Sequence, residues 1–116
     1  MNNPILIAMT NPVSAARDSE FNRWYDEVHA RDILSLPGML SITRYRGMEQ
    51  IRPDAAPPRY RYLAIYEMDS PTAPVAALVA ARPTFQMSDA LAPDPLAISF
   101  TPIYFARKNG AVSGDS

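Results

Sequence analysis

The segment from Glu20 to Arg46 constrains the fold most, because its periodicity changes at one sharp point. From Phe21 onward, aromatic and aliphatic residues recur at helical spacing, which predicts a helix with one apolar side. That helix should stop before Pro37-Gly38, and the residues from Leu40 to Arg46 then alternate as in a strand. The segment therefore predicts a helix, a turn and a strand in direct succession.

The rest of the chain divides into similar periodic segments. Its 12 prolines, against 4 glycines, fall mostly between these segments and punctuate them. A short apolar run and a strictly alternating run predict strands, and an alanine-rich run after the helix-start signal Asp69 to Thr72 predicts a helix. The expected elements are strands over 5–9, 60–68 and 98–107, a helix over 73–81 and a broken helical piece over 84–91. Pro102 inside the last strand favours an edge position or a bulge.

The order strand, helix, strand, strand, helix, strand predicts an α+β fold of the ferredoxin-like βαββαβ type. Its four-stranded antiparallel sheet would carry both helices on one face. We expect one domain over residues 1–107 and a flexible C-terminal tail over residues 108–116. The other sheet face would stay uncovered and carry Leu63, Ile65 and Ile42. Because an exposed apolar face favours association, the sequence predicts a homodimer.

Composition narrows the chemistry. With no cysteine and a single histidine, we expect no disulfide, no thiol nucleophile and no zinc site, although His29 with Asp26 or Asp32 could hold a metal weakly. No glycine-rich phosphate loop or dinucleotide fingerprint occurs, so we predict no cofactor. The net charge of −1 indicates no general attraction for nucleic acid or anionic membranes, and the apolar run over 4–9 is too short to span a bilayer. No signal-peptide pattern precedes that run, so a cytoplasmic location is expected.

His29 is the best candidate for chemistry, because histidine alone titrates near neutral pH when unperturbed. On a regular helix Tyr25, Val28 and Asp32 lie near the centre of the apolar side, with His29 on its flank. The spacings of Tyr25 to His29 and of His29 to Asp32 let both pairs touch. An inward Asp32 carboxylate needs a partner, and pairing with His29 would orient the imidazole and raise its pKa. A catalytic or ligand-binding His29 and a purely structural hydrogen bond both remain open.

Tyrosines form the second cluster of candidates. Tyr60, Tyr62 and Tyr66 share one face of the strand over 60–68. If that face meets the first helix, Tyr62 and Tyr66 could join Tyr25 and His29 around an aromatic-walled cavity that suits a small hydrophobic ligand. Ordinary tyrosine packing is the alternative. The long loop over 47–59 is expected to be mobile and to lie near the mouth of that cavity.

The string FNRWYDEVHARDILSLPGMLSITRYR resembles the N-terminal half of small dimeric α/β-barrel proteins, and among them the EthD-like branch. Members of that branch carry a similar aromatic-Asn-x-Trp-Tyr start, a histidine one turn later and a Pro-Gly turn into the second strand. The later string YRYLAIYEMDSP is similar to their third strand and helix start. The resemblance covers roughly residues 4–106, with its specific motif in 21–46. Where many relatives have an apolar residue and a proline after the histidine, this chain has Ala30 and Arg31.

The resemblance implies a ferredoxin-like fold and a barrel formed by two subunits. Related barrels include cofactor-free monooxygenases, isomerases, cyclases, decarboxylases and haem-degrading enzymes, so haem bound through His29 also stays open. One fold that hosts many reactions means that function must be argued from the site.

The sequence therefore predicts a homodimer that acts on, or holds, a small aromatic or apolar metabolite. As an enzyme, a cofactor-independent lyase, isomerase or monooxygenase-like protein, it would use His29 for proton transfer. Asp32 or Tyr25 would orient His29, and an enolate or carboxylate would be stabilised by Tyr62, Tyr66 or Arg44. Trp24 would contact the substrate or belong to the core. The alternatives are a non-catalytic ligand-binding or accessory protein of a catabolic pathway, and a purely structural dimer.

Overall fold

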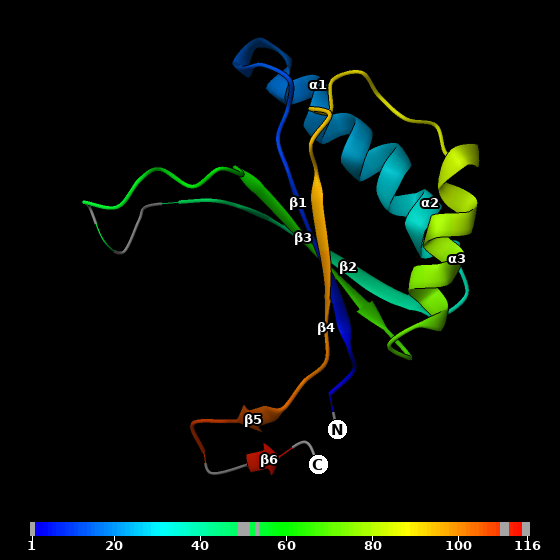
Figure 1. The fold of residues 1–116 in the computed structure, drawn as a ribbon, viewed down its shortest axis with the longest axis vertical. Coiled ribbons are helices and arrows are strands. Elements are labelled where there is room, and N and C mark those ends of the chain that lie inside the picture. The colour runs from blue at the N-terminus through cyan, green and yellow to red at the C-terminus, as the bar shows by residue number, and fades with distance from the viewer. Residues whose placement is uncertain (1, 49–51, 53, 110–111, 115–116) are drawn as a thin grey trace.

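The computed structural model describes residues 2–48, 52, 54–109 and 112–114. Its main sheet has the order β2-β3-β1-β4, and every neighbouring pair in it is antiparallel. The four strands are β1 (Ile5–Thr10), β2 (Met39–Arg46), β3 (Tyr62–Met68) and β4 (Leu96–Phe100). Figure 1 shows the helices together on one face of this sheet. The predicted ferredoxin-like α+β fold is confirmed.

One continuous helical run connects β1 to β2. After a 3₁₀ turn, η1 (Ala15–Arg17), it comprises α1 (Asp18–Trp24), a π-helical turn η2 (Tyr25–His29) and α2 (Ala30–Leu34). In the π-helical turn, the Ala30 N–H donates to the Tyr25 carbonyl five residues before it. The residues that follow the turn are thereby displaced around the helix axis relative to a regular α-helix.

Because of this displacement, the inward face of the helix differs from the face that regular helical spacing predicts. Ile33, which is 1% exposed, occupies the inward position that a regular helix would give to Asp32. Asp32 is half-buried instead. The prediction of an inward Asp32 was wrong because a π-helical turn has no residue signature that spacing alone can detect.

The turn after α2 depends on one glycine. Gly38 has a φ of 86°, in the region that residues with a Cβ rarely adopt. A Cβ at this position would lie 2.6 Å from the Pro74 Cγ and 2.7 Å from the Asp69 Oδ1. Gly38 therefore lets the chain enter β2 directly beneath the start of the second helix.

The second helix, α3 (Ala73–Ala81), has the predicted bounds, and a 3₁₀ turn η3 (Arg82–Thr84) follows it. The helical piece expected over 84–91 was wrong, because the chain after Thr84 forms a loop that returns across the helices. Tertiary hydrogen bonds hold that loop: the Val13 N–H donates to the Ala90 carbonyl, and the Ala92 N–H donates to the Asn11 carbonyl. These bonds take the place of the local bonds of a helix.

The last predicted strand, over 98–107, is interrupted. β4 ends at Phe100, and the residues around Pro102, which lacks an N–H, belong to no strand. The chain then forms β5 (Tyr104–Ala106), which pairs with β6 (Val112–Gly114) in a separate two-stranded sheet. Figure 1 shows this pair projecting away from the main sheet. β6 thus lies within the stretch that was expected to form a tail.

The two faces of the main sheet differ in cover. The side chains of β3 that face the helices, from Tyr62 to Met68, are buried, as the alternating pattern predicted. Tyr60 lies outside β3. On the opposite face Ile65 pairs with Ile7, which pairs with Ile98 in turn. Ile42 pairs with the buried Tyr66 and so lies on the covered face, which corrects its expected place on the open one. Within the described ranges, none of the helices is long and apolar enough to cross a membrane.

Candidate functional site

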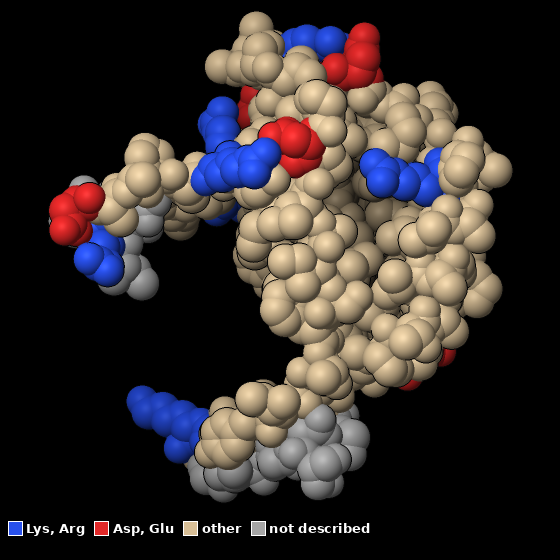
Figure 2. Space-filling view, viewed as in Figure 1, with Lys and Arg blue, Asp and Glu red and all other residues tan. Residues whose placement is uncertain are grey.

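A cavity lies between the covered face of the sheet and the helices. Its floor consists of side chains that are at most 3% exposed, namely Leu6, Tyr25, Ile33 and Tyr66, whereas Arg82, Met87 and Pro95 at its mouth are exposed. The cavity measures about 130 Å³, close to the roughly 150 Å³ of an apolar cavity known to hold benzene. In Figure 2 the hollow between sheet and helices is bordered mainly by uncharged side chains, with basic atoms at its rim. Its size and apolar floor suit one small ring.

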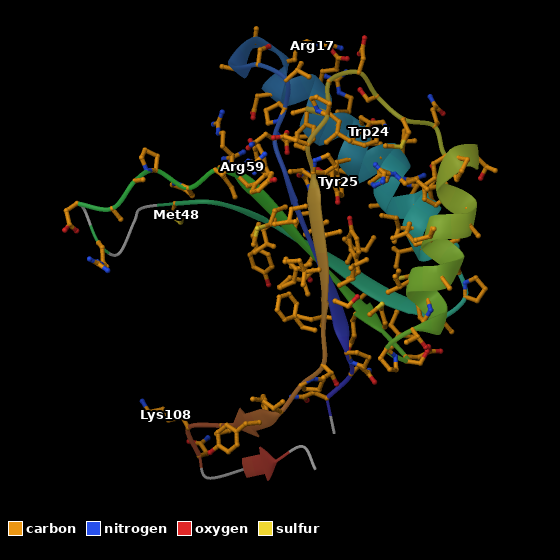
Figure 3. The ribbon with its side chains drawn as sticks, in the orientation of Figure 1. Arg17, Trp24, Tyr25, Met48, Arg59 and Lys108 are labelled. Atoms are coloured by element: carbon orange, nitrogen blue, oxygen red, sulfur yellow. The ribbon has the colours of Figure 1, made fainter. Side chains whose placement is uncertain are left out.

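His29 belongs to the wall of this cavity. Its ring stacks on Trp24 at a centroid distance of 4.7 Å and meets the Tyr25 ring edge-on at 4.9 Å. The Nδ1 atom is buried and has no hydrogen-bond partner among the described residues. Trp24 and Tyr25, which are labelled in Figure 3, form the aromatic support of the imidazole. The aromatic neighbours thus fix the position and orientation of the ring, and its Nδ1 forms no hydrogen bond with the described residues.

Burial lowers the pKa of His29 to about 4, because the charged imidazolium would lose its hydration. The Asp32 carboxylate opposes this effect, whereas the charges of Arg82 and Arg44 add to it. Asp32 acts at a distance, since no hydrogen bond to His29 forms and Asp32 does not line the cavity. The Asp32 carboxylate thus raises the pKa of His29 as expected, but desolvation outweighs it and the net shift is downward. At neutral pH the imidazole is uncharged.

Two buried tyrosines complete the polar part of the cavity floor. The Tyr25 and Tyr66 hydroxyls are hydrogen-bonded to each other. Burial raises the pKa of both, so both phenols stay protonated at neutral pH. Two hydroxyls contain two protons and share one hydrogen bond, so one O–H remains able to donate to a bound molecule.

Arg44 lies on the other side of Tyr25, outside the cavity. Its guanidinium donates to the Asp26 Oδ1 at 2.8 Å and to the Asn22 Oδ1 at 2.9 Å, and lies 4.2 Å from the centre of the Tyr25 ring. Tyr62 is part of the same group, because its hydroxyl donates to the Asp18 Oδ1 at 2.5 Å and accepts from Asn22 at 3.1 Å. We refer to Asp18, Asn22, Asp26, Arg44 and Tyr62 as the Arg44 cluster.

The structure thus divides the predicted site residues between two places. Trp24, Tyr25, His29 and Tyr66 meet at the cavity, while Tyr62 and Arg44 belong to the Arg44 cluster. None of the described residues of the loop over 47–59 lines the cavity, and Figure 1 shows these described residues extending away from the helices. Its expected place at the cavity mouth was wrong, and residues 49–51 and 53 lie outside the described part of the chain.

Sequence reasoning missed the mouth of the cavity. Arg82, Met87 and Pro95 come from η3 and the returning loop, whose path depends on tertiary hydrogen bonds rather than on local pattern. Thr10 on β1, which is 5% exposed, also lines the cavity. The available signal was Arg82 itself, a charged residue directly after an uncharged helix.

The geometry of the site suits neither a metal ion nor haem. Over the described ranges, no group of three or more histidine or acidic side chains is placed to hold a metal ion. Haem is several times larger than benzene and does not fit a cavity of about 130 Å³. The residues present therefore match a small organic molecule better than either group.

Comparison with known proteins shows the fold of this chain. No family model and no curated protein matches its sequence. A solved structure from Shewanella loihica PV-4, a protein that has been proposed to be a monooxygenase, superposes with a TM-score of 0.54 at 17% identity and covers 88% of this chain and 98% of its own. HapK from Hahella chejuensis has a TM-score of 0.46 at 18% identity and covers 90% of this chain and 98% of its own. The first likeness agrees with the ferredoxin-like arrangement described above.

Proposed function

We propose that this protein binds a small aromatic or apolar metabolite in the His29 cavity and uses the imidazole for cofactor-free proton transfer. One observation carries the proposal. A neutral imidazole whose buried Nδ1 has no hydrogen-bond partner among the described residues forms part of the wall of an apolar cavity of a size that suits one ring. A structural histidine normally has its buried nitrogens bonded, since an unpaired buried polar atom costs about 1–3 kcal/mol. A buried nitrogen without a partner requires an explanation, and the one that we propose is a ring kept for a ligand.

The local helix supports the same proposal. Tyr25 and His29 are the two ends of the π-helical turn η2, and such turns occur frequently at functional sites. The turn presents Tyr25 and His29 to the cavity together, and brings Ile33 rather than Asp32 into its floor. A carboxylate is thereby kept out of a cavity that would otherwise have to bury its charge.

Isomerisation next to a carbonyl is the simplest reaction that these groups could catalyse. The imidazole accepts a proton from a carbon α to the carbonyl, and the electron pair of that C–H bond forms the new carbon–carbon double bond of an enolate. The carbonyl π pair moves to the oxygen, which accepts a hydrogen bond from the Tyr25–Tyr66 hydroxyl pair. The imidazolium then returns the proton to the substrate at the same or another carbon, so that no cofactor is consumed.

Replacement of His29 by Asn tests this proposal. Deuterium incorporation at the α-carbon of acetophenone in D₂O can be followed by NMR, with the protein as catalyst. We expect His29→Asn to lower the protein-dependent rate at least about 100-fold, because one positioned acid or base contributes about 10²–10⁴-fold. Asp32→Asn is the matched control and should lower the rate less, since Asp32 acts on His29 only at a distance. A folded His29→Asn variant with the rate of the original protein would refute the catalytic role.

A non-catalytic ligand-binding or accessory role is the second candidate. The observation that favours it is the pKa of about 4 for His29, because a base this weak is far from the optimum for proton transfer at neutral pH. In this role the imidazole would donate or accept one hydrogen bond to the ligand. His29→Asn would then weaken ligand binding without any catalysed exchange in either protein.

We further propose that two copies associate through the uncovered sheet face, as in the EthD-like dimeric barrels that the motif over 21–46 resembles. This face carries Ile7, Leu63, Ile65, Ile98 and Phe100, and the last two are 42% and 46% exposed. Ile65→Glu would place a charge at its centre and should shift the protein from dimer to monomer in light scattering at micromolar concentration. Arg31→Glu, on the exposed side of α2, should leave the mass unchanged. A monomeric original protein would refute the dimer.

A further inference from the structure

The charges around the cavity have one sign. Among the residues that line it there is no aspartate and no glutamate, and Arg82 is the one residue that carries a charge at neutral pH. The polar groups on the wall, His29, Thr10 and the Tyr25–Tyr66 pair, are neutral. An apolar cavity with a single cationic group at its mouth favours a ligand with one apolar end and one anionic end.

Some arginines of this chain pair with a carboxylate, and Arg82 belongs to those that form no ion pair among the described residues. Arg17, Arg44 and Arg59 each form an ion pair with a carboxylate at 2.5–2.8 Å. In the described part of the chain, no ion pair or hydrogen bond engages the Arg82 guanidinium. Arg82 begins η3, directly after α3, where its side chain is exposed and reaches the cavity. Its planar fork of donors is therefore free to bind a carboxylate in bidentate fashion.

Arg82 and His29 act on one another electrostatically. The Arg82 charge contributes to the low pKa of His29, so the guanidinium is close enough to influence the imidazole. An anion bound to Arg82 would offset that contribution and bring the imidazole nearer to the range in which it can exchange protons. Recognition of the anion and readiness of His29 for proton transfer would then be coupled.

We infer that the ligand of this site is a small aromatic or similarly compact apolar carboxylate, held with its carboxylate on Arg82 at the mouth and its ring in the floor. This inference rests on the proposed function, because it assumes that the His29 cavity is the binding site. The ring lies between Trp24 and the Tyr25–Tyr66 pair, beside His29, so that the carbon framework faces the imidazole while the charge stays near solvent. A neutral molecule of the same shape would lack the contact with Arg82.

Benzoate and benzamide provide a matched pair of probes, since they share a ring and a planar head group and differ in charge. Trp24 is the single tryptophan of the chain and lines the cavity, so its indole N–H resonance reports occupancy in an NMR titration. In the original protein we expect benzoate to bind at least about tenfold more tightly than benzamide, as one charge-assisted hydrogen-bonded pair would give. Arg82→Met should remove this preference, because benzoate loses its charge-assisted contact.

Arg31→Met is the control for net charge, because it removes one exposed arginine that does not line the cavity. It should keep the preference for benzoate. If benzoate and benzamide bind with equal affinity, both to the original protein and to Arg82→Met, the inference about the anion is overturned. The cavity then remains the proposed binding site. If neither probe shifts the Trp24 resonance in the original protein, the cavity is not the site, and the proposed function fails together with the inference.

Discussion

The two sides of Tyr25 differ in how their polar side chains are paired. On one side, the Arg44 cluster joins an arginine, two aspartates, an asparagine and a tyrosine in direct hydrogen bonds of 2.5–3.1 Å. On the other side, the cavity combines a histidine whose buried Nδ1 has no partner and an arginine that engages no carboxylate within the described ranges. The Tyr25 ring separates the two, with Arg44 against its face and His29 at 4.9 Å.

This difference separates polar groups that stabilise the fold from polar groups that are available to a ligand. Groups that hold a helix to a sheet do so by bonding one another, and the Arg44 cluster links α1 and η2 to β2 and β3 in this way. Groups that serve a ligand must be left unpaired in its absence, which costs stability. Removal of a polar group should therefore have different consequences in the cavity and in the Arg44 cluster.

The largest expected effect is the pH dependence of stability that His29 imposes. Its pKa is about 4 in the folded protein and 6.5 as the reference for the unfolded chain, so between these values the unfolded chain binds the proton more strongly. The contribution of the neutral imidazole to the free energy of unfolding is complete above pH 6.5. It is lost as the pH falls toward 4, by up to about 3 kcal/mol. Groups that act on His29 are Asp32 on α2, Arg82 on η3 and Arg44 on β2.

Urea unfolding at a series of pH values, with His29→Asn as the comparison, measures this effect. The Asn variant should lose less free energy of unfolding between pH 6.5 and 4, because it has no imidazole to protonate. Identical pH profiles for the two proteins would mean that His29 is not held neutral by burial.

A smaller effect, about 2 kcal/mol in the free energy of unfolding, is expected for Arg44→Met. The change removes charge-assisted hydrogen bonds to Asp26 and Asn22 and the contact with the Tyr25 ring, while methionine keeps part of the packing volume. Asp26 is 62% exposed, so its carboxylate stays hydrated and limits the cost. Binding of benzoate, read from Trp24, should change little. A large loss of binding with unchanged stability would place Arg44 in the ligand site instead.

Local pattern predicted much of the fold and only half of the site. Strict alternation in β3 placed Tyr66 and Met68 on the buried face, and the alanine-rich segment gave α3 its observed bounds. Both features depend on periodicity, which sequence contains directly. The Pro37-Gly38 turn was also evident, although the packing that requires Gly38 involves Pro74 and Asp69, far away in the chain.

The missing parts of the site depend on tertiary structure. The π-helical turn exchanges Asp32 for Ile33 on the inner face, and the loop after Thr84 brings Met87 and Pro95 to the cavity mouth. Tyr62 was assigned to the site because its face of β3 was expected to meet the first helix, which is correct, and Arg44 lies on the same covered face. The covered face of the sheet is wide enough for both the cavity and the Arg44 cluster. The packing of Tyr25 decides which residues belong to each.

The smallest expected effect, about 1 kcal/mol, is the coupling between the Tyr25 and Tyr66 hydroxyls. Each single change to Phe leaves the other hydroxyl buried without its partner, which costs about 1–2 kcal/mol in the free energy of unfolding. The double variant removes both hydroxyls and should therefore be destabilised by less than the sum of the single variants. A double-mutant cycle by urea unfolding measures the difference, and Tyr62→Phe paired with Tyr66→Phe is the control, since the Tyr62 hydroxyl bonds to Asp18 and Asn22 instead. Strict additivity for Tyr25 and Tyr66 would show that each hydroxyl finds another partner, such as water in the cavity, and that the floor is wetter than its apolar lining suggests.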